Sequence, residues 1–202
     1  MTQTSVLDKG YVALLEVGNE IVIAEAATAS TGRDVPDWER LVRTLLQKGH
    51  LTPFEFVGLR WEIYAPVFVR DQMFRHRTFS FVAQSQRYSK EDVEYYVPTR
   101  VGQYAEHLIQ DHIHQCELVA EELLEANVPR EIATRVRPSF RYTRWAMRTD
   151  LRNLMHFLQL RLAGDTQWET RQYAGAMYRM ASTACPVTFG EWDKHYQGGK
   201  KQ

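Results

Sequence analysis

The chain has 202 residues, 44% of them hydrophobic, and its 25 basic and 25 acidic side chains cancel. This length is enough to bury a core, and the neutral balance argues against a nonspecific nucleic-acid binder driven by bulk charge. Two cysteines are too few for a disulfide framework, and neither a signal peptide nor a membrane-spanning apolar run is visible. We expect a cytoplasmic protein with no membrane partner, one domain over residues 1–196 and a polar tail over 197–202.

The N-terminal half predicts strands and helices in turn. We expect a strand over residues 11–17 and a helix over 34–48, which has a proline near its start and a glycine just past its end. Over residues 57–65 the apolar side chains occupy every second position, which predicts a half-buried strand. Pro66 can open the next helix, so Arg75 and the residues after it fall at a helix end and in the following loop.

The C-terminal half begins with an amphipathic pattern that predicts a long helix over residues 105–126. Cys116 belongs to its apolar stripe, so we place this thiol in the core. A short helix is expected from Pro129. Residues 142–149 are ambiguous, although their aromatic content and alternation favour a strand, and Asp150 then resembles the N-cap of a helix.

The helix expected after Asp150 has an apolar stripe and, beside it, a polar face. Arg152, His156 and Gln159 share that face at helical spacing, which makes it a candidate pocket wall. The alternative for His156 is a satisfied, partly buried histidine. A last helix from about Thr166 carries an ordinary apolar core face.

Three histidines lie on or near the long helix, namely His107, His112 and His114. No set of cysteines or carboxylates completes a metal site around them, so we expect histidines that face solvent and no bound metal.

The densest polar motif is Arg75-His76-Arg77, followed after seven residues by Ser85 and then by Arg87. Such a concentration of fixed donors suggests a phosphate-bearing ligand, because the guanidinium group matches phosphate oxygens in charge and geometry. A solvated charged loop is the alternative, and the negative end of a helix would suit Arg75 even without a ligand.

Arginine also replaces lysine further along the chain. Eight arginines lie between residues 130 and 161, inside a stretch over residues 91–193 that has no lysine. This usage favours bidentate recognition of phosphate or stacking on a ring, unless it reflects only a preference for arginine codons.

Other short segments accompany the arginine motif in a fixed order. Together with it they resemble the flavin-dependent thymidylate synthases over nearly the whole length of the chain. These segments are His50 with Thr52-Pro53-Phe54-Glu55, Ala65-Pro66 with Gln72, Arg87-Tyr88-Ser89, Val128-Pro129-Arg130-Glu131, Leu154-Met155-His156-Phe157, Arg161, Gln167-Trp168-Glu169 and Cys185-Pro186.

The resemblance implies an α/β (α+β) fold, a single domain with a mixed or antiparallel sheet flanked by long helices, assembled as a homotetramer. FAD would bind where subunits meet. The implied reaction moves a one-carbon unit from methylenetetrahydrofolate to C5 of a uracil nucleotide and reduces it with electrons from NADPH. No cysteine nucleophile is needed for this route.

The resemblance also carries roles for individual residues. Arg161 would be catalytic, stabilising negative charge on the pyrimidine so that C5 becomes nucleophilic. The residues implied to hold the nucleotide are Gln72, Arg75, Ala83, Gln84, Ser85, Gln86, Arg87 and Arg135. Those implied to lie at the flavin are His50, Thr52, Arg75, His76, Arg77, Ala83, Asp150, Arg152 and His156.

Three departures from the family pattern fall on this pocket. Val82 and Ala83 stand where Asn-Glu is common, Thr134 stands where an arginine is usual, and Asp150 replaces an asparagine. Arg135 is adjacent to Thr134 and is a candidate to replace the phosphate contact. Loss of a sugar-facing carboxylate at Ala83 slightly favours UMP over dUMP as substrate, as in the UMP-methylating branch associated with polyoxin-type antibiotics.

Three alternatives stay open. One is a conventional synthase that converts dUMP to dTMP, and another is a flavin- and nucleotide-binding relative without methyl transfer. A third treats the arginine-rich region as an RNA-binding surface, which predicts steep salt dependence and no flavin absorption.

Overall fold

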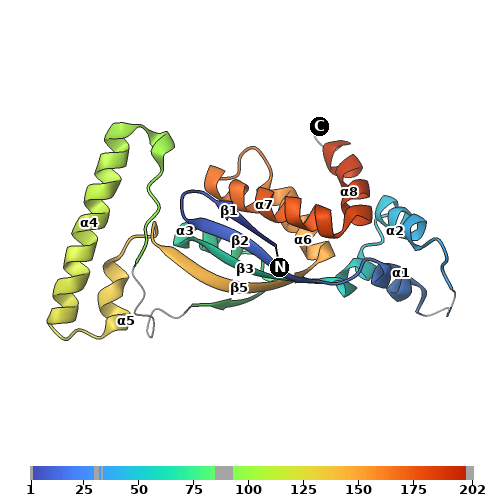
Figure 1. Ribbon diagram of the computed structural model, residues 1–202, viewed down its shortest axis with the longest axis horizontal. Coiled ribbons are helices and arrows are strands. Elements are labelled where there is room, and N and C mark those ends of the chain that lie inside the picture. Colours follow the sequence, from blue (N-terminus) through green and yellow to red (C-terminus); the bar gives the residue numbers. More distant parts are fainter. Residues whose placement is uncertain (1, 30–31, 33, 85–92, 199–202) are drawn as a thin grey trace.

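The computed structural model describes residues 2–29, 32, 34–84 and 93–198. At its centre lies a five-stranded sheet in the order β1-β2-β3-β5-β4, in which neighbouring strands are antiparallel (Figure 1). The strands are β1 (Thr2–Val6), β2 (Gly10–Val17), β3 (Gly58–Pro66), β4 (Ser80–Ala83) and β5 (Tyr142–Asp150).

The helices lie at several places around this sheet. In Figure 1, α6 and α7 lie over the sheet, α4 and α5 form a separate arm at one end of it, and α1 and α2 lie at the opposite end. The expected α/β fold, with an antiparallel sheet flanked by long helices, is therefore confirmed. The helices are α1 (Ile21–Thr28), α2 (Trp38–Gln47), α3 (Val67–Met73), α4 (Gln103–Glu125), α5 (Arg130–Ala133), α6 (Leu151–Arg161), α7 (Trp168–Ala184) and α8 (Pro186–Gly198), with short 3-10 helices η1 (Thr52–Phe56), η2 (Thr99–Val101) and η3 (Thr134–Val136).

The alternation of side chains decides which face of the sheet is buried. In β5, Trp145 and Met147 point into the core, whereas Arg144, Ala146 and Arg148 are exposed on the opposite face. Such alternation is what an antiparallel sheet shows when one face packs on a core and the other meets solvent. The strands predicted over residues 11–17, 57–65 and 142–149 are confirmed by β2, β3 and β5.

The observed helix ends are set by local capping interactions and differ by a few residues from the ends predicted from the apolar pattern. Helix α2 begins at Trp38 rather than Asp34, because the Asp37 carboxylate accepts a hydrogen bond from the backbone N–H of Arg40 at 3.1 Å. It ends before Gly49, whose φ of 69° is left-handed and suits glycine. The last predicted helix likewise begins two residues later than expected, at the start of α7.

The prediction for Cys116 is wrong. Its side chain is partly exposed, and on α4 only Ile113 and Ala120 are buried. The reason is that α4 packs mainly on α5, η2 and η3 and stands apart from the sheet (Figure 1). An amphipathic stripe identified the helix correctly but not the partner that its apolar face meets.

The histidines of the arm behave as expected, since His107, His112 and His114 are all exposed. The other cysteine, Cys185, is fully buried, and burial raises the pKa of its thiol to about 12. Within the described part of the chain, no helix is both long and apolar enough to cross a bilayer.

Candidate functional site

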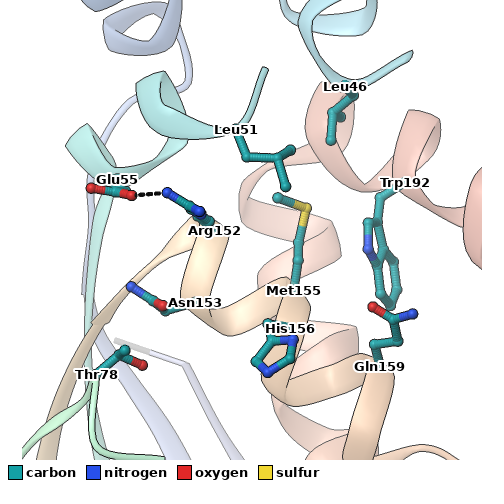
Figure 2. A pocket seen from close by; sticks show the side chains of 10 residues that line it. All are labelled: Leu46, Leu51, Glu55, Thr78, Arg152, Asn153, Met155, His156, Gln159 and Trp192. Atoms are coloured by element: carbon teal, nitrogen blue, oxygen red, sulfur yellow. Dashed lines mark hydrogen bonds and ion pairs between the residues drawn. The ribbon is translucent and has the colours of Figure 1, made fainter. Parts of the chain in front are cut away.

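A pocket of about 660 Å³ opens beside the N-terminal half of α6. Figure 2 shows a polar side with Glu55, Arg152 and Asn153, and a more apolar side toward Leu46 and Trp192. The face of α6 that carries Arg152, His156 and Gln159 does line a pocket, as its spacing predicted. The lining residues are Leu46, Leu51, Glu55, Thr78, Arg152, Asn153, Met155, His156, Gln159 and Trp192.

Asp150 fixes the start of α6 and thereby this pocket wall. Its carboxylate accepts hydrogen bonds from the backbone N–H of Asn153 at 2.9 Å and from the side-chain amide of Asn153 at 2.7 Å. The predicted N-cap is confirmed. Both carboxylate oxygens therefore serve the helix, and the amide of Asn153 is oriented where it lines the pocket.

Arg152 is held at the edge of the pocket by Glu55 from η1. The two side chains form an ion pair, drawn as a dashed line in Figure 2, and both are more than two-fifths exposed. An exposed pair adds little to stability. Its consequence is positional, because it keeps a guanidinium beside a pocket large enough for a ligand.

His76 follows α3 and packs among aromatic rings. Its imidazole stacks on Phe79 at 5.6 Å between centroids, meets Phe157 edge-on at 4.9 Å, and lies 6.5 Å from the ring of His156. Burial, together with the charge of Arg161 and with His156, lowers the pKa of His76 to about 4. The ring is therefore neutral at neutral pH.

Arg161 joins this aromatic cluster to a second, more polar cavity. Its Nε donates to Nε2 of His76 at 3.1 Å, and its Nη2 donates to the backbone carbonyl of Gln72 at 3.4 Å. Burial and the nearby charge of Arg75 lower its pKa. This cavity of about 380 Å³ is lined by Gln72, Leu160, Arg161, Asp165, Thr166, Gln167 and Thr170.

The wall of the second cavity has an unsatisfied group. The hydroxyl of Thr170 is fully buried and has no hydrogen-bond partner among the residues that the structure describes. Buried hydroxyls are normally paired, so a polar group from a ligand or water is the expected partner.

The other predicted site residues are more scattered. Arg75 and Arg77 are exposed on either side of His76, and His50 and Thr52 are exposed at the end of η1 nearest α2. Ala83 and Gln84 lie on or beside the edge strand β4, and Arg135 is exposed on η3. Ser85, Gln86 and Arg87 lie outside the described residues.

Several pocket residues were not predicted. Glu55 was visible within the Thr-Pro-Phe-Glu segment, but nothing in that segment showed that it pairs with Arg152. Asn153 follows Asp150 by three residues, the spacing of a capped first turn, and that signal could have identified it. Trp192 comes from α8, a helix that the sequence did not suggest.

The donor set of the first pocket fits a flavin dinucleotide. Such a ligand needs apolar surface for its ring system and cations for its phosphates. Met155 and Trp192 supply apolar wall, and Arg152 supplies a positive charge at the edge of the pocket. His156 and Asn153 add groups that can hydrogen-bond a polar ring edge.

Comparison with known proteins gives a consistent family assignment. Residues 14–187 match the family model described as "Thymidylate synthase complementing protein". The flavin-dependent thymidylate synthase of Thermotoga neapolitana is 40% identical over 206 residues, covering 96% of this chain and 95% of that protein. The flavin-dependent thymidylate synthase of Thermus thermophilus is 36% identical over 214 residues, covering 96% of this chain and 79% of that protein.

Solved structures with the same fold include the UMP/dUMP methylase PolB from Streptomyces cacaoi. The form bound with 5-Br dUMP superposes with a TM-score of 0.83 at 24% identity, covering 95% of this chain and 97% of that chain. The form bound with 5-Br UMP gives a TM-score of 0.81 at 25% identity, covering 93% and 95%.

Proposed function

The chain belongs to the flavin-dependent thymidylate synthase family, and from this premise we propose that it methylates C5 of a uridine 5′-monophosphate. The proposed carbon donor is methylenetetrahydrofolate and the proposed reductant is NADPH. The observation that carries the proposal is Arg161, held by His76 and by the backbone of Gln72 at a polar cavity close to the α6 pocket. The chain is thus a flavin-dependent methyltransferase whose exact substrate has to be assigned.

Arg161 is suited to activate the pyrimidine. Two of its nitrogens are fixed by His76 and by the carbonyl of Gln72, which leaves Nη1 without a partner in the described part of the chain. A pre-oriented cation stabilises negative charge as it develops and needs no reorganisation at that moment. Placed beside the uracil, it would favour charge on N3 and O4 and so make C5 nucleophilic.

The α6 pocket is the proposed flavin site. When bound, FAD supplies the hydride chemistry of the reaction. Arg152 would neutralise phosphate charge, and Asn153 and His156 would orient the polar ring edge from a helix that Asp150 caps. The rings of Phe79 and Phe157 pack against His76 and so hold the imidazole that orients Arg161.

The proposed preference for UMP over dUMP rests on β4. Val82 is 75% exposed and Ala83 is also exposed, so within residues 80–83 the strand β4 carries no carboxylate and is open to solvent. A ribose adds a 2′-hydroxyl that needs space and a partner. The protein PolB, which has the same fold, is described as a UMP/dUMP methylase, so both nucleotides are candidate substrates and the preference between them rests on β4.

We also propose that protomers assemble as a homotetramer with active sites at their interfaces. The arm presents large apolar side chains to solvent in the single chain, since Tyr104 is 79% exposed and Leu108, Leu118 and Val119 are also exposed. Several large apolar side chains exposed on one helix are typical of an interface. Light scattering on the purified protein tests the mass of the assembly directly.

A parallel assay tests the function and the sugar choice together. Flavin-loaded protein is given UMP or dUMP with methylenetetrahydrofolate and NADPH, and the methylated nucleotide is measured. We expect product from both, with UMP turned over faster. Full flavin occupancy without either product would reject methyl transfer and favour a flavin- and nucleotide-binding relative.

A further inference from the structure

Arg141 is a buried cation that makes few hydrogen bonds to the described part of the chain. The residue is 9% exposed and lies immediately before β5. Its Nη1 donates to the backbone carbonyl of Thr134 at 3.3 Å, while its buried Nε has no hydrogen-bond partner among the described residues. A guanidinium has five N–H donors, and the one side-chain hydrogen bond of Arg141 to the described residues is that from Nη1.

The neighbouring positive charges further raise the free energy of the buried, charged Arg141. Burial and the positive charges of Arg70, Arg137 and Arg135 lower its pKa, opposed by Tyr95. Like charges around a desolvated cation raise its free energy. A guanidinium stays protonated in a protein, so it cannot lower this free energy by becoming neutral. The positive charge of this cluster, formed by Arg70, Arg135, Arg137 and Arg141, therefore exceeds the negative charge that the described residues place beside it.

Two of these neighbours already have their own carboxylates. Arg137 donates two hydrogen bonds to Oε2 of Glu117, at 2.8 and 3.1 Å, and Arg70 donates two to Oδ1 of Asp71, at 2.8 and 3.1 Å. Within the ranges that the structure describes, no carboxylate pairs with Arg141 or with the exposed Arg135. These two guanidiniums are the part of the cluster that lacks an anion.

Buried charges in proteins are normally paired, because burying an unpaired charge lowers the free energy of unfolding by roughly several kcal/mol. A doubly charged phosphate ester matches the deficit, since it can accept bidentate hydrogen bonds from one guanidinium while its charge is shared by another. A carboxylate ligand would supply half the charge. The chemistry of the cluster thus selects a phosphate monoester.

We propose that Arg141, assisted by Arg135, binds the 5′-phosphate of the nucleotide substrate. This assignment rests on the proposed function for the identity of the nucleotide. Thr134 cannot provide the contact itself, because its buried hydroxyl donates to the carbonyl of Arg130 at 2.8 Å. The guanidinium of Arg141 lies directly against the backbone of Thr134 and takes over the phosphate contact at this point of the fold.

The test compares a nucleotide with its nucleoside, so that only the phosphate differs. Calorimetry on flavin-loaded protein measures the affinities of UMP and uridine for wild type, Arg141→Leu and Arg141→Lys. Wild type should prefer UMP by roughly 10- to 100-fold, the range expected for charge-assisted hydrogen bonds. Arg141→Leu should lose most of this ratio, and Arg141→Lys should keep part of it, because lysine retains the charge but not the fork.

Arg137→Leu is the matched control. Arg137 lies in the same cluster, but its guanidinium is already paired with Glu117, so the UMP/uridine ratio should stay at the wild-type value. An unchanged ratio in Arg141→Leu, or an equal loss in Arg137→Leu, would overturn the phosphate site.

Thermal unfolding separates a binding role from a structural one. Inorganic phosphate should raise the Tm of wild type and leave that of Arg141→Leu unchanged, while without phosphate the variant should unfold at the wild-type temperature or above. A lower Tm with an intact phosphate response would mean that Arg141 is structural. If Arg141→Leu does not fold, Arg141→Lys decides, because a wild-type UMP/uridine ratio in that folded variant rejects bidentate binding.

Failure of this inference and failure of the proposed function give different results. A UMP/uridine ratio that depends on Arg141, without methylated product, keeps the phosphate site and rejects the reaction. If methylated product forms but the UMP/uridine affinity ratio is the same with and without Arg141, the proposed reaction is supported and the proposed phosphate site is rejected.

Discussion

Nε of Arg161 donates a hydrogen bond to Nε2 of His76 at 3.1 Å, and this contact requires an unprotonated nitrogen on the imidazole. For Nε2 to accept this hydrogen bond, His76 must be neutral and carry its proton on Nδ1. Its pKa of about 4, lowered by burial, by Arg161 and by His156, agrees with that requirement. The orientation of the proposed catalytic guanidinium thus depends on a neutral histidine.

Arg161→Ala should abolish methyl transfer while the protein retains FAD. The guanidinium is proposed to act on the pyrimidine, and the α6 pocket does not include it. Turnover and the flavin spectrum are measured on the same preparation. Arg171→Ala is the control, because among the described residues this guanidinium donates to the carbonyl of Gly164 and to no group of either cavity. Wild-type turnover in Arg161→Ala would remove Arg161 from catalysis.

Stability should fall between pH 6.5 and pH 4 because of His76. Its pKa is about 4 when folded and 6.5 in the unfolded chain, so in this window the unfolded chain binds more protons. The contribution is complete above pH 6.5 and is lost as the pH falls, by about 1 to 2 kcal/mol after solvent screening at a partly exposed ring. Denaturant titrations over this range measure it.

His76→Gln should flatten that pH dependence, because the amide oxygen still accepts from Arg161 but does not titrate. His114→Gln, on the exposed side of α4, should follow wild type. Parallel curves for wild type and His76→Gln would contradict the assignment.

Arg152→Gln should weaken FAD binding by about 10-fold or more and reduce its dependence on salt. The lost group is a cation beside the pocket, and a charge-assisted hydrogen bond is worth about 1.5 to 3 kcal/mol. Flavin fluorescence during titration gives both values. Arg43→Gln removes a comparable exposed ion pair on α2, with Glu39, and should leave FAD binding unchanged.

Asp150→Ala should destabilise the protein by about 1 kcal/mol, whereas Asp150→Asn should change stability far less, since both side chains cap helices well. The carboxylate accepts from the backbone and the amide of Asn153, and asparagine can keep the backbone contact. Thermal denaturation of both variants provides the comparison. Equal losses would mean that the charge matters more than the cap.

Ala83→Glu should move the substrate preference toward dUMP. The position is exposed on an edge strand, so the larger side chain fits without disturbing the core. The ratio of kcat/KM for UMP and dUMP measures the change, with the neighbouring Val82→Glu as the control for added charge. If the ratio stays at the wild-type value, position 83 does not determine the preference between UMP and dUMP.

The sequence predicted elements whose cause is local. Alternation marked β3 and β5, and the polar face of α6 was visible from the spacing of Arg152, His156 and Gln159, because each of these patterns repeats within one element. Asp150 was recognisable because capping needs only the next three residues.

Elements that depend on distant partners were not predictable in this way. β1, α1, β4 and α8 are short or have weak periodicity, and their packing partners lie elsewhere in the chain. The same limit applied to the site, where Glu55 meets Arg152 across 97 positions and Arg161 meets His76 across 85. Cys116 was misplaced because an apolar stripe does not say which surface covers it.

The separation of the arm from the sheet has a thermodynamic consequence. Helix α4 packs mainly on α5 and on the short helices η2 and η3, so most of its contacts can be lost while the five-stranded sheet stays intact. In an isolated protomer the arm should open as a unit of its own, with amide hydrogens that exchange well before those of β3 and β5. A single free energy of unfolding would then describe the protein only when neighbouring protomers couple the two units, and its value would depend on protein concentration.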